Sequence, residues 1–193
     1  MHYIDWVEVA SETESLTDYV EKLSQQVRHK KPVFAGLSFG GIMAMGLSKI
    51  YGSEFAIMLS SFRDKRDLKA SLRALLGIKA YQLIPNIEMN AIRTLVRKAY
   101  ATSSKVSEEK LIEMMGAESP MFLRWACKQI DEYQYDLPAD IQLYPIVGTK
   151  DRLVNVWKDH EEIRRVRGGS HITVYAQSEE VNNYISEILE QYV

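Results

Sequence analysis

The chain has 193 residues, of which 46% are hydrophobic and 26% are charged, and its formal net charge is −2. This length suits a single domain, residues 1–193, with a substantial hydrophobic core. The near balance of charge argues against nucleic acid as a partner, because phosphate binding needs an excess of Lys and Arg in one patch.

Cys127 is the only cysteine, so no disulfide can form within the chain, which favours a reducing compartment. The first residues lack the pattern of a signal peptide, and no apolar run approaches the roughly 20 residues that span a membrane. We therefore expect a cytoplasmic protein without a membrane partner. No Cys or His pair has zinc-ligand spacing, so no metal site is expected.

Short strand-like runs alternate with longer helical runs, which is typical of a parallel sheet covered by helices. Ser15 is predicted to cap the first helix. The expected strands, in chain order, are 2–7, 32–37, 55–59, 142–147 and a short one before Gly168. The helices expected after the first are 39–51 and 178–191. The residues of the last helix expected to face inward are Val181, Tyr184, Ile185, Ile188 and Leu189.

This alternation stops between residues 63 and 138, where the sequence shows no convincing strand. Three helical patterns fall in this stretch, around 68–76, 91–100 and 120–130. A helical insertion between two strands of such a sheet is usually a lid over the functional site, so 63–138 is predicted to be a lid or cap. Extra helical packing against the sheet remains the alternative.

The run GLSFGG contains G-x-S-x-G directly after a predicted strand and directly before a predicted helix. This setting places Ser38 on a sharp turn that lifts its hydroxyl out of the sheet. Strand and helix are expected to approach closely at Gly36 and Gly40, which leaves no room for a side chain at either position. Gly41 lets the helix pack tightly. The N–H of Phe39, at the helix N-terminus, is the expected first oxyanion donor.

A dinucleotide-binding loop also follows a strand and begins a helix, so it is an alternative interpretation of this run. The same run matches G-x-G-x-x-G except at its second glycine, where Ser38 stands. The next predicted strand ends in Ser60 and Ser61, where that fold needs an acidic residue for the ribose. Both departures argue against a nicotinamide or flavin site, and no cofactor is expected.

A serine nucleophile needs a base, and the base needs an orienting acid. Asp151 follows the predicted strand 142–147, and His171 lies in a glycine-rich loop before the last helix. The order serine, acid, histidine, with each residue after a strand, is that of the α/β-hydrolase triad. We therefore predict Ser38 as nucleophile, Asp151 as orienting acid and His171 as base.

Taken together, the runs IMLSS, GLSFGG, GTKD and GGSH resemble the bacterial α/β-hydrolase superfamily of esterases and related acyl hydrolases. The resemblance covers nearly the whole chain. It implies an α/β-hydrolase fold, with a mostly parallel sheet flanked by helices and a helical lid insertion. It also implies a nucleophile elbow, ester-type substrates and no metal or organic cofactor.

One departure from this family concerns the start of the sheet. Members usually begin with another strand, which lies beside the strand leading to the nucleophile and whose following Gly-rich loop gives the second oxyanion donor. This sequence begins at what looks like the next strand, 2–7. A start codon further upstream, a fold without that strand, or a strand from another chain would each account for it. Losing one oxyanion donor typically costs about 10²–10³ in rate.

The function expected from these residues is acyl transfer from a small-molecule substrate, a small carboxylic ester, to water. Thioester, lactone and amide substrates remain open, as does a non-catalytic ligand-binding or interaction protein on the same scaffold. An exposed sheet edge is also expected to allow a homo-oligomer. The residues that either line an acyl pocket or pack the insertion against the sheet are Met114, Met115, Met121, Phe122 and Trp125.

Overall fold

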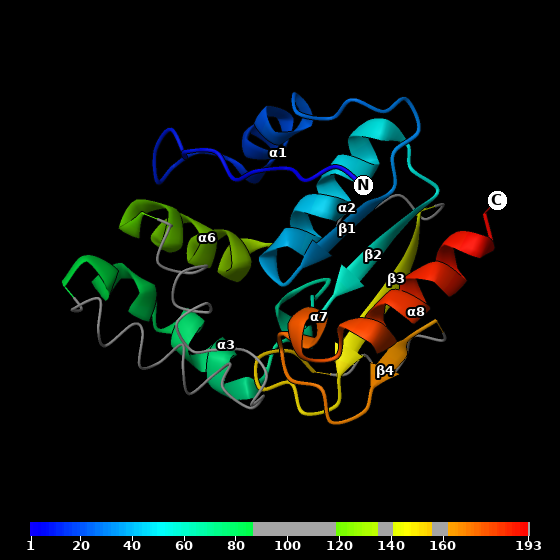
Figure 1. Cartoon of the computed structure of the whole chain (residues 1–193). Helices are drawn as coiled ribbons and strands as arrows, with labels where there is room; N and C mark the ends of the chain where they lie inside the picture. Colours follow the sequence, from blue (N-terminus) through cyan, green and yellow to red (C-terminus); the bar gives the residue numbers. More distant parts are fainter. Residues whose placement is uncertain (87–118, 135–140, 156–161, 193) are drawn as a thin grey trace.

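Four parallel strands in the order β1-β2-β3-β4 form the sheet (Figure 1). The structure is a computed structural model that describes residues 1–86, 119–134, 141–155 and 162–192. The strands are β1 (Phe34–Leu37), β2 (Phe55–Leu59), β3 (Gln142–Gly148) and β4 (Arg164–Val166). Because all four are parallel, their carboxyl ends lie at one edge of the sheet.

Helices cover both faces of this sheet, which explains why β2 is buried at every position. The helix α2 (Phe39–Tyr51) packs on β1 and β2, and α1 (Leu16–Ser24) packs on α2. On the opposite face α8 (Ser178–Glu190) packs on β3 and β4, preceded by the short α7 (Thr173–Ala176). Within the described ranges, no helix combines the length and the apolar character needed to cross a bilayer.

The predicted start of the first helix is confirmed. The Ser15 side chain accepts a hydrogen bond from the Asp18 N–H at 3.1 Å, which satisfies one of the unpaired donors at the helix N-terminus. The inward face of α1 buries Tyr19, Val20 and Leu23. This apolar stripe anchors the helix on α2.

The predicted strand 2–7 is wrong, because this segment has no strand partner in the described structure. Side chains of α1 and of the residues after it satisfy its backbone instead. The Tyr19 hydroxyl accepts from the Val7 N–H at 3.2 Å and donates to the Val7 carbonyl at 2.8 Å. The Gln26 amide likewise accepts from the Asp5 N–H and donates to the Asp5 carbonyl, both at 2.9 Å.

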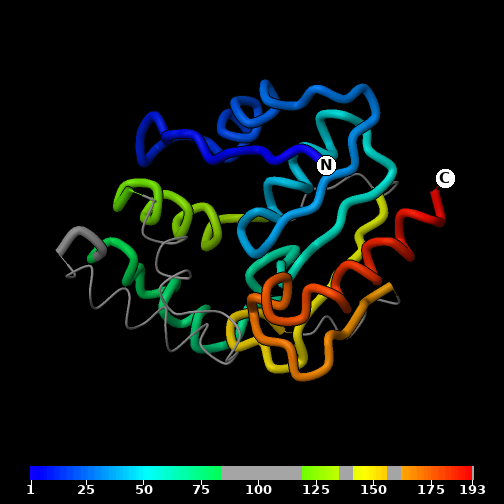
Figure 2. Tube along the Cα trace, in the orientation of Figure 1, coloured from blue at the N-terminus to red at the C-terminus, as the bar shows by residue number. Residues whose placement is uncertain are grey.

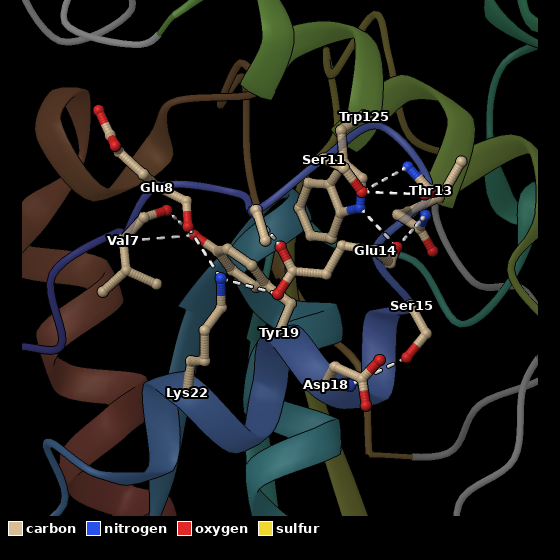
Figure 3. A network of polar contacts seen from close by, with 12 residues as sticks. Val7, Glu8, Ser11, Thr13, Glu14, Ser15, Asp18, Tyr19, Lys22 and Trp125 are labelled. Carbon is tan, nitrogen blue, oxygen red and sulfur yellow. Dashed lines mark hydrogen bonds and ion pairs between the residues drawn. The ribbon is translucent and has the colours of Figure 1, made fainter.

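The loop between this segment and α1 is fixed by Glu14 (Figure 3). Its carboxylate, 6% exposed, pairs with Lys22 at 2.7 Å and accepts from the Ala10 N–H at 2.6 Å. Its carbonyl accepts from the Trp125 indole N–H at 2.9 Å. Trp125 belongs to α6, so one residue joins the N-terminal segment, α1 and α6.

The described part of the insertion 63–138 contains α3 (Ala70–Gly77), α6 (Pro120–Glu132) and the short 3₁₀ helices η1 (Lys65–Asp67) and η2 (Ala80–Asn86). The helical patterns around 68–76 and 120–130 agree with α3 and α6, whereas 91–100 lies outside the described residues. The Lys69 N–H, just before α3, donates to the Leu153 carbonyl at 2.8 Å. This bond fastens the start of α3 to the loop after β3.

The last helix ends at Glu190, one residue before its predicted bound, and one of its predicted inward positions differs. Val181 and Ile188 are buried, but Leu189 is 41% exposed, so its predicted inward position is wrong. The helix covers β3 and β4, whereas Leu189 points past them into a cavity beside β1.

The single thiol, on α6, generates a prediction about reactivity. Burial raises the pKa of Cys127 to about 11, because the thiolate would lose hydration. At pH 8 we expect iodoacetamide to alkylate the native thiol roughly a hundredfold more slowly than the urea-unfolded one, with the rate rising as the pH approaches 11. Intact-protein mass against time measures both rates. Equal rates in the two states would contradict a buried thiol.

Candidate active site

Ser38 occupies the turn between β1 and α2 in a backbone conformation that non-glycine residues rarely adopt. Its φ is 54° and its ψ is −121°. Two hydrogen bonds hold this turn. The Ser38 N–H donates to the Leu59 carbonyl at 2.9 Å, and the Ser61 hydroxyl donates to the Ser38 carbonyl at 2.6 Å. The end of β2 therefore fixes the strained residue.

Two of the neighbouring glycines are required by close packing. A Cβ at Gly36 would lie 2.0 Å from the Gly40 carbonyl oxygen, and one at Gly41 would lie 2.1 Å from the Ser61 hydroxyl oxygen. Gly40 differs from the expectation, because a Cβ there would meet nothing within 4 Å in the part of the chain that the structure describes. Its Cα instead faces the cavity beside β1, which Gly40 helps to line.

Asp151 and His171 are joined directly. The distance between Asp151 Oδ2 and His171 Nδ1 is 2.9 Å, and each side chain is 1% exposed. The other carboxylate oxygen, Oδ1, accepts from the N–H groups of Leu153 and Val154 at 2.8 and 2.9 Å. Because a carboxylate only accepts hydrogen bonds, Nδ1 is the nitrogen that carries a proton toward Asp151. This is the tautomer in which a neutral imidazole presents the Nε2 lone pair, as a general base needs.

The loops that carry these two residues are bonded to each other. The Lys150 N–H donates to the Gly169 carbonyl at 2.8 Å, and the Gly168 N–H donates to the Thr149 hydroxyl at 2.8 Å. A Cβ at Gly148 would lie 2.3 Å from the Gly169 carbonyl oxygen. No role for Gly148 was predicted from the sequence. Its position at the end of a strand, just before the predicted acid, is the signal that could have indicated it.

The predicted residues thus gather at the carboxyl edge of the sheet. Ser38 follows β1, Asp151 follows β3 and His171 follows β4. Asp151 and His171 are hydrogen-bonded, while Ser38 is bonded to the end of β2, the strand between β1 and β3. Phe39 begins α2, so its N–H lies at a helix N-terminus as expected. Among the described residues, no group of His, Cys, Asp or Glu could hold a metal ion.

An aromatic cluster next to Ser38 was not predicted from the sequence. The rings of Trp6 and Phe39 stack with centroids 5.9 Å apart, and Trp125 meets Phe39 edge-on at 5.8 Å. The ring centroids of Phe122 and Trp6 are 5.3 Å apart, and those of Tyr19 and Trp125 are 4.4 Å apart. Such contacts add stability beyond burial of area.

This cluster bears on the residues considered for an acyl pocket. Phe122 and Trp125 are 7% and 0% exposed, and both belong to the hydrophobic core. Met121 is partly buried against the same core. These contacts favour the packing alternative for all three, whereas Met114 and Met115 lie outside the described residues.

Comparison with known proteins shows likeness in fold. No family model and no curated protein matches the sequence. An esterase from Thermogutta terrifontis superimposes with a TM-score of 0.67 at 16% identity, over 95% of this chain and 74% of that one. For the N-acyl homoserine lactonase AidH the TM-score is 0.68 at 13% identity, over 91% of this chain and 70% of that one. The meta-cleavage product hydrolase CumD from Pseudomonas fluorescens gives 0.64 at 16%, over 96% and 74%.

These likenesses, together with the parallel sheet and its flanking helices, show that the chain has the α/β-hydrolase fold. Ser38, Asp151 and His171 each follow a strand, as predicted from the sequence. At these identities the comparisons show the fold alone.

The two glycines of the elbow predict opposite effects of one substitution. Gly36→Ala should lower the free energy of unfolding by about 1–3 kcal/mol, because the new methyl group meets backbone. Gly40→Ala should raise it by up to about 0.5–1 kcal/mol, since alanine favours the helix and the space is open. Urea unfolding of the two variants and the parent chain measures both. Equal destabilisation by the two variants would show that a side chain at position 40 is crowded as well.

Proposed function

We propose that the chain is a serine hydrolase that cleaves a small carboxylic ester through Ser38, His171 and Asp151. The observation that carries this proposal is the buried hydrogen bond between Asp151 and His171 at the sheet edge where Ser38 occupies a strained turn. Strain of this kind is retained at functional sites because it aims a side chain.

The proposed first step is attack on the ester carbonyl. His171 Nε2 takes the Ser38 hydroxyl proton while the oxygen forms a bond to the carbonyl carbon. The carbonyl π electrons move to its oxygen, where the Phe39 N–H at the start of α2 donates to the negative charge. When the carbonyl re-forms, the bond to the alcohol breaks and His171 returns its proton to the leaving oxygen. Water repeats the sequence on the acyl-enzyme and releases the acid.

Asp151 acts through His171 in this scheme. Its carboxylate keeps the proton on Nδ1 and stabilises the imidazolium that forms during each step. The Leu153 and Val154 N–H groups hold the carboxylate in place, so the imidazole needs no reorientation as charge develops.

The substrate class rests on the chemistry of the proposed nucleophile. An activated serine hydroxyl attacks carbonyl carbon, and the structural neighbours include an esterase and a lactonase, both of which are named for cleaving acyl–oxygen bonds. The proposed scheme uses no metal or organic cofactor. The insertion 63–138 is proposed as the lid over this site, because the start of α3 is bonded to the loop that carries Asp151.

The first test is reaction with a fluorophosphonate probe, read as intact-protein mass. We expect a mass gain of one probe in the parent chain and none in Ser38→Ala. Ser186→Ala, which removes an exposed serine of α8, is the matched control and should react like the parent. A folded parent chain that gains no mass would contradict the proposal and favour a non-catalytic binding protein.

The orienting role of the acid gives a second prediction. In Asp151→Asn the amide oxygen would accept from Leu153 and Val154, and the amide NH₂ would face His171 Nδ1. This arrangement moves the imidazole proton to Nε2, so kcat should fall by about 10⁴. Initial rates on an ester panel measure the loss, with Asp18→Asn as a surface control. An unchanged kcat in Asp151→Asn would remove Asp151 from the mechanism.

A further inference from the structure

One edge of β1 is open in the described structure. β1 pairs with β2 on one side, and no described strand pairs with the other side. The Ser38 N–H points to β2, and backbone groups alternate sides along a parallel strand. Ala35 and Leu37 therefore direct their N–H and C=O groups to the open edge. An edge of this kind is a template for pairing with another strand.

A cavity of about 680 Å³ lies along this edge. Its walls come from β1, from α2 on one face, from α8 on the other and from the extended start of the chain. Figure 2 shows that start, in dark blue, next to the segment that leads into β1. The side chains that form the two helical walls are apolar: Met43, Ala44, Leu47, Ile185 and Leu189.

The volume of this slot is that of a short strand. A strand residue occupies roughly 3.3 Å along the strand, 4.8 Å between strands and 10 Å between packed layers, so about four residues fill the volume. β1 itself has four residues. The slot therefore has room for one strand about as long as β1.

The residues that the structure describes leave this room unused. Gly40 lines the slot, and a Cβ there would meet no described atom within 4 Å. Val33 and Leu189, which also line it, are 42% and 41% exposed. Large apolar side chains facing an open sheet edge are typical of an interaction site.

We propose that this slot binds an extended apolar strand of another polypeptide, which pairs with the open edge of β1. The partner strand needs apolar side chains on both faces, because α2 and α8 cover it from both sides. It needs acidic residues before the strand, since the exposed basic residues Arg28, His29 and Lys31 lie at the slot end where β1 begins. That placement corresponds to a strand parallel to β1.

A second copy of this chain is a poorer occupant. Its β1 is covered by its own α2, so that strand cannot enter a slot that already has a helix on each face. A free extended segment meets no such obstacle. The docking itself does not depend on the proposed hydrolysis, because it uses the edge of β1 and not the triad residues.

The experiment uses the full chain and a labelled synthetic peptide. The peptide has two glutamates, then an alternating run of valine and isoleucine as long as β1, then two glycines. We expect saturable binding by fluorescence anisotropy. Ala35→Glu should abolish binding by placing a charge at the slot. Lys31→Glu should weaken it about fivefold, whereas Lys30→Glu, beside the slot but outside its lining, should not.

A proline-containing peptide and a measurement of the oligomeric state serve as controls. A peptide with prolines in the central run lacks the N–H donors for pairing and should not bind. Equal binding of both peptides would overturn the proposal in favour of non-specific apolar adsorption. No saturable binding by folded protein would also overturn it. Light scattering provides the last check. A dimer that Ala35→Glu dissociates would also overturn the proposal, because a second copy would then fill the slot. None of these readouts uses ester hydrolysis, so they stand apart from the test of the triad.

Discussion

The close approach of β1 and α2 is the constraint on which the proposed site depends. The turn at Ser38 forms because Gly36 has no side chain where the backbone of Gly40 comes near. The Ser61 hydroxyl then holds the Ser38 carbonyl, and Gly41 leaves room for that hydroxyl. A positive φ at a serine is costly, so the energy of the neighbouring packing and hydrogen bonds keeps it in place.

The acid and the base are positioned by a second, separate arrangement. The loops after β3 and β4 share backbone hydrogen bonds, and Gly148 allows them to meet. Asp151 and His171 are therefore set relative to each other before any contact with the serine is considered. The parallel sheet relates the two arrangements, since it brings every strand's carboxyl end to one edge.

Sequence patterns predicted the elements whose signals are local. The helix Phe39–Tyr51 and the strand Phe55–Leu59 were predicted with their observed bounds, because glycines and apolar runs mark their ends. The segment 2–7 was predicted as a strand and is not one. It is rich in the aromatic and β-branched residues that favour strands, but pairing depends on a neighbouring strand, and here Tyr19 and Gln26 satisfy the backbone instead.

At the site, sequence alone indicated the residue types and their order. It could not indicate the aromatic contact between Trp6 and Phe39, because those residues lie far apart in the chain and the motif that contains Phe39 does not specify what its ring contacts. The open space beside Gly40 was equally invisible, since the glycine pattern indicates the same need for close packing at every position. Both features depend on what lies across the fold rather than along the chain.

The way in which the first residues are attached has a consequence for local opening. A strand that is paired through backbone hydrogen bonds unfolds together with its sheet. This segment is held by the side chains of Tyr19 and Gln26 instead. Its release therefore breaks a few bonds to α1 and to the residues after it, and leaves β1 to β4 paired. Amide hydrogens of this segment should exchange through a small sub-global opening, well below the free energy that protects the central strands. One wall of the slot beside β1 is thus a separate cooperative unit from the sheet that forms its edge.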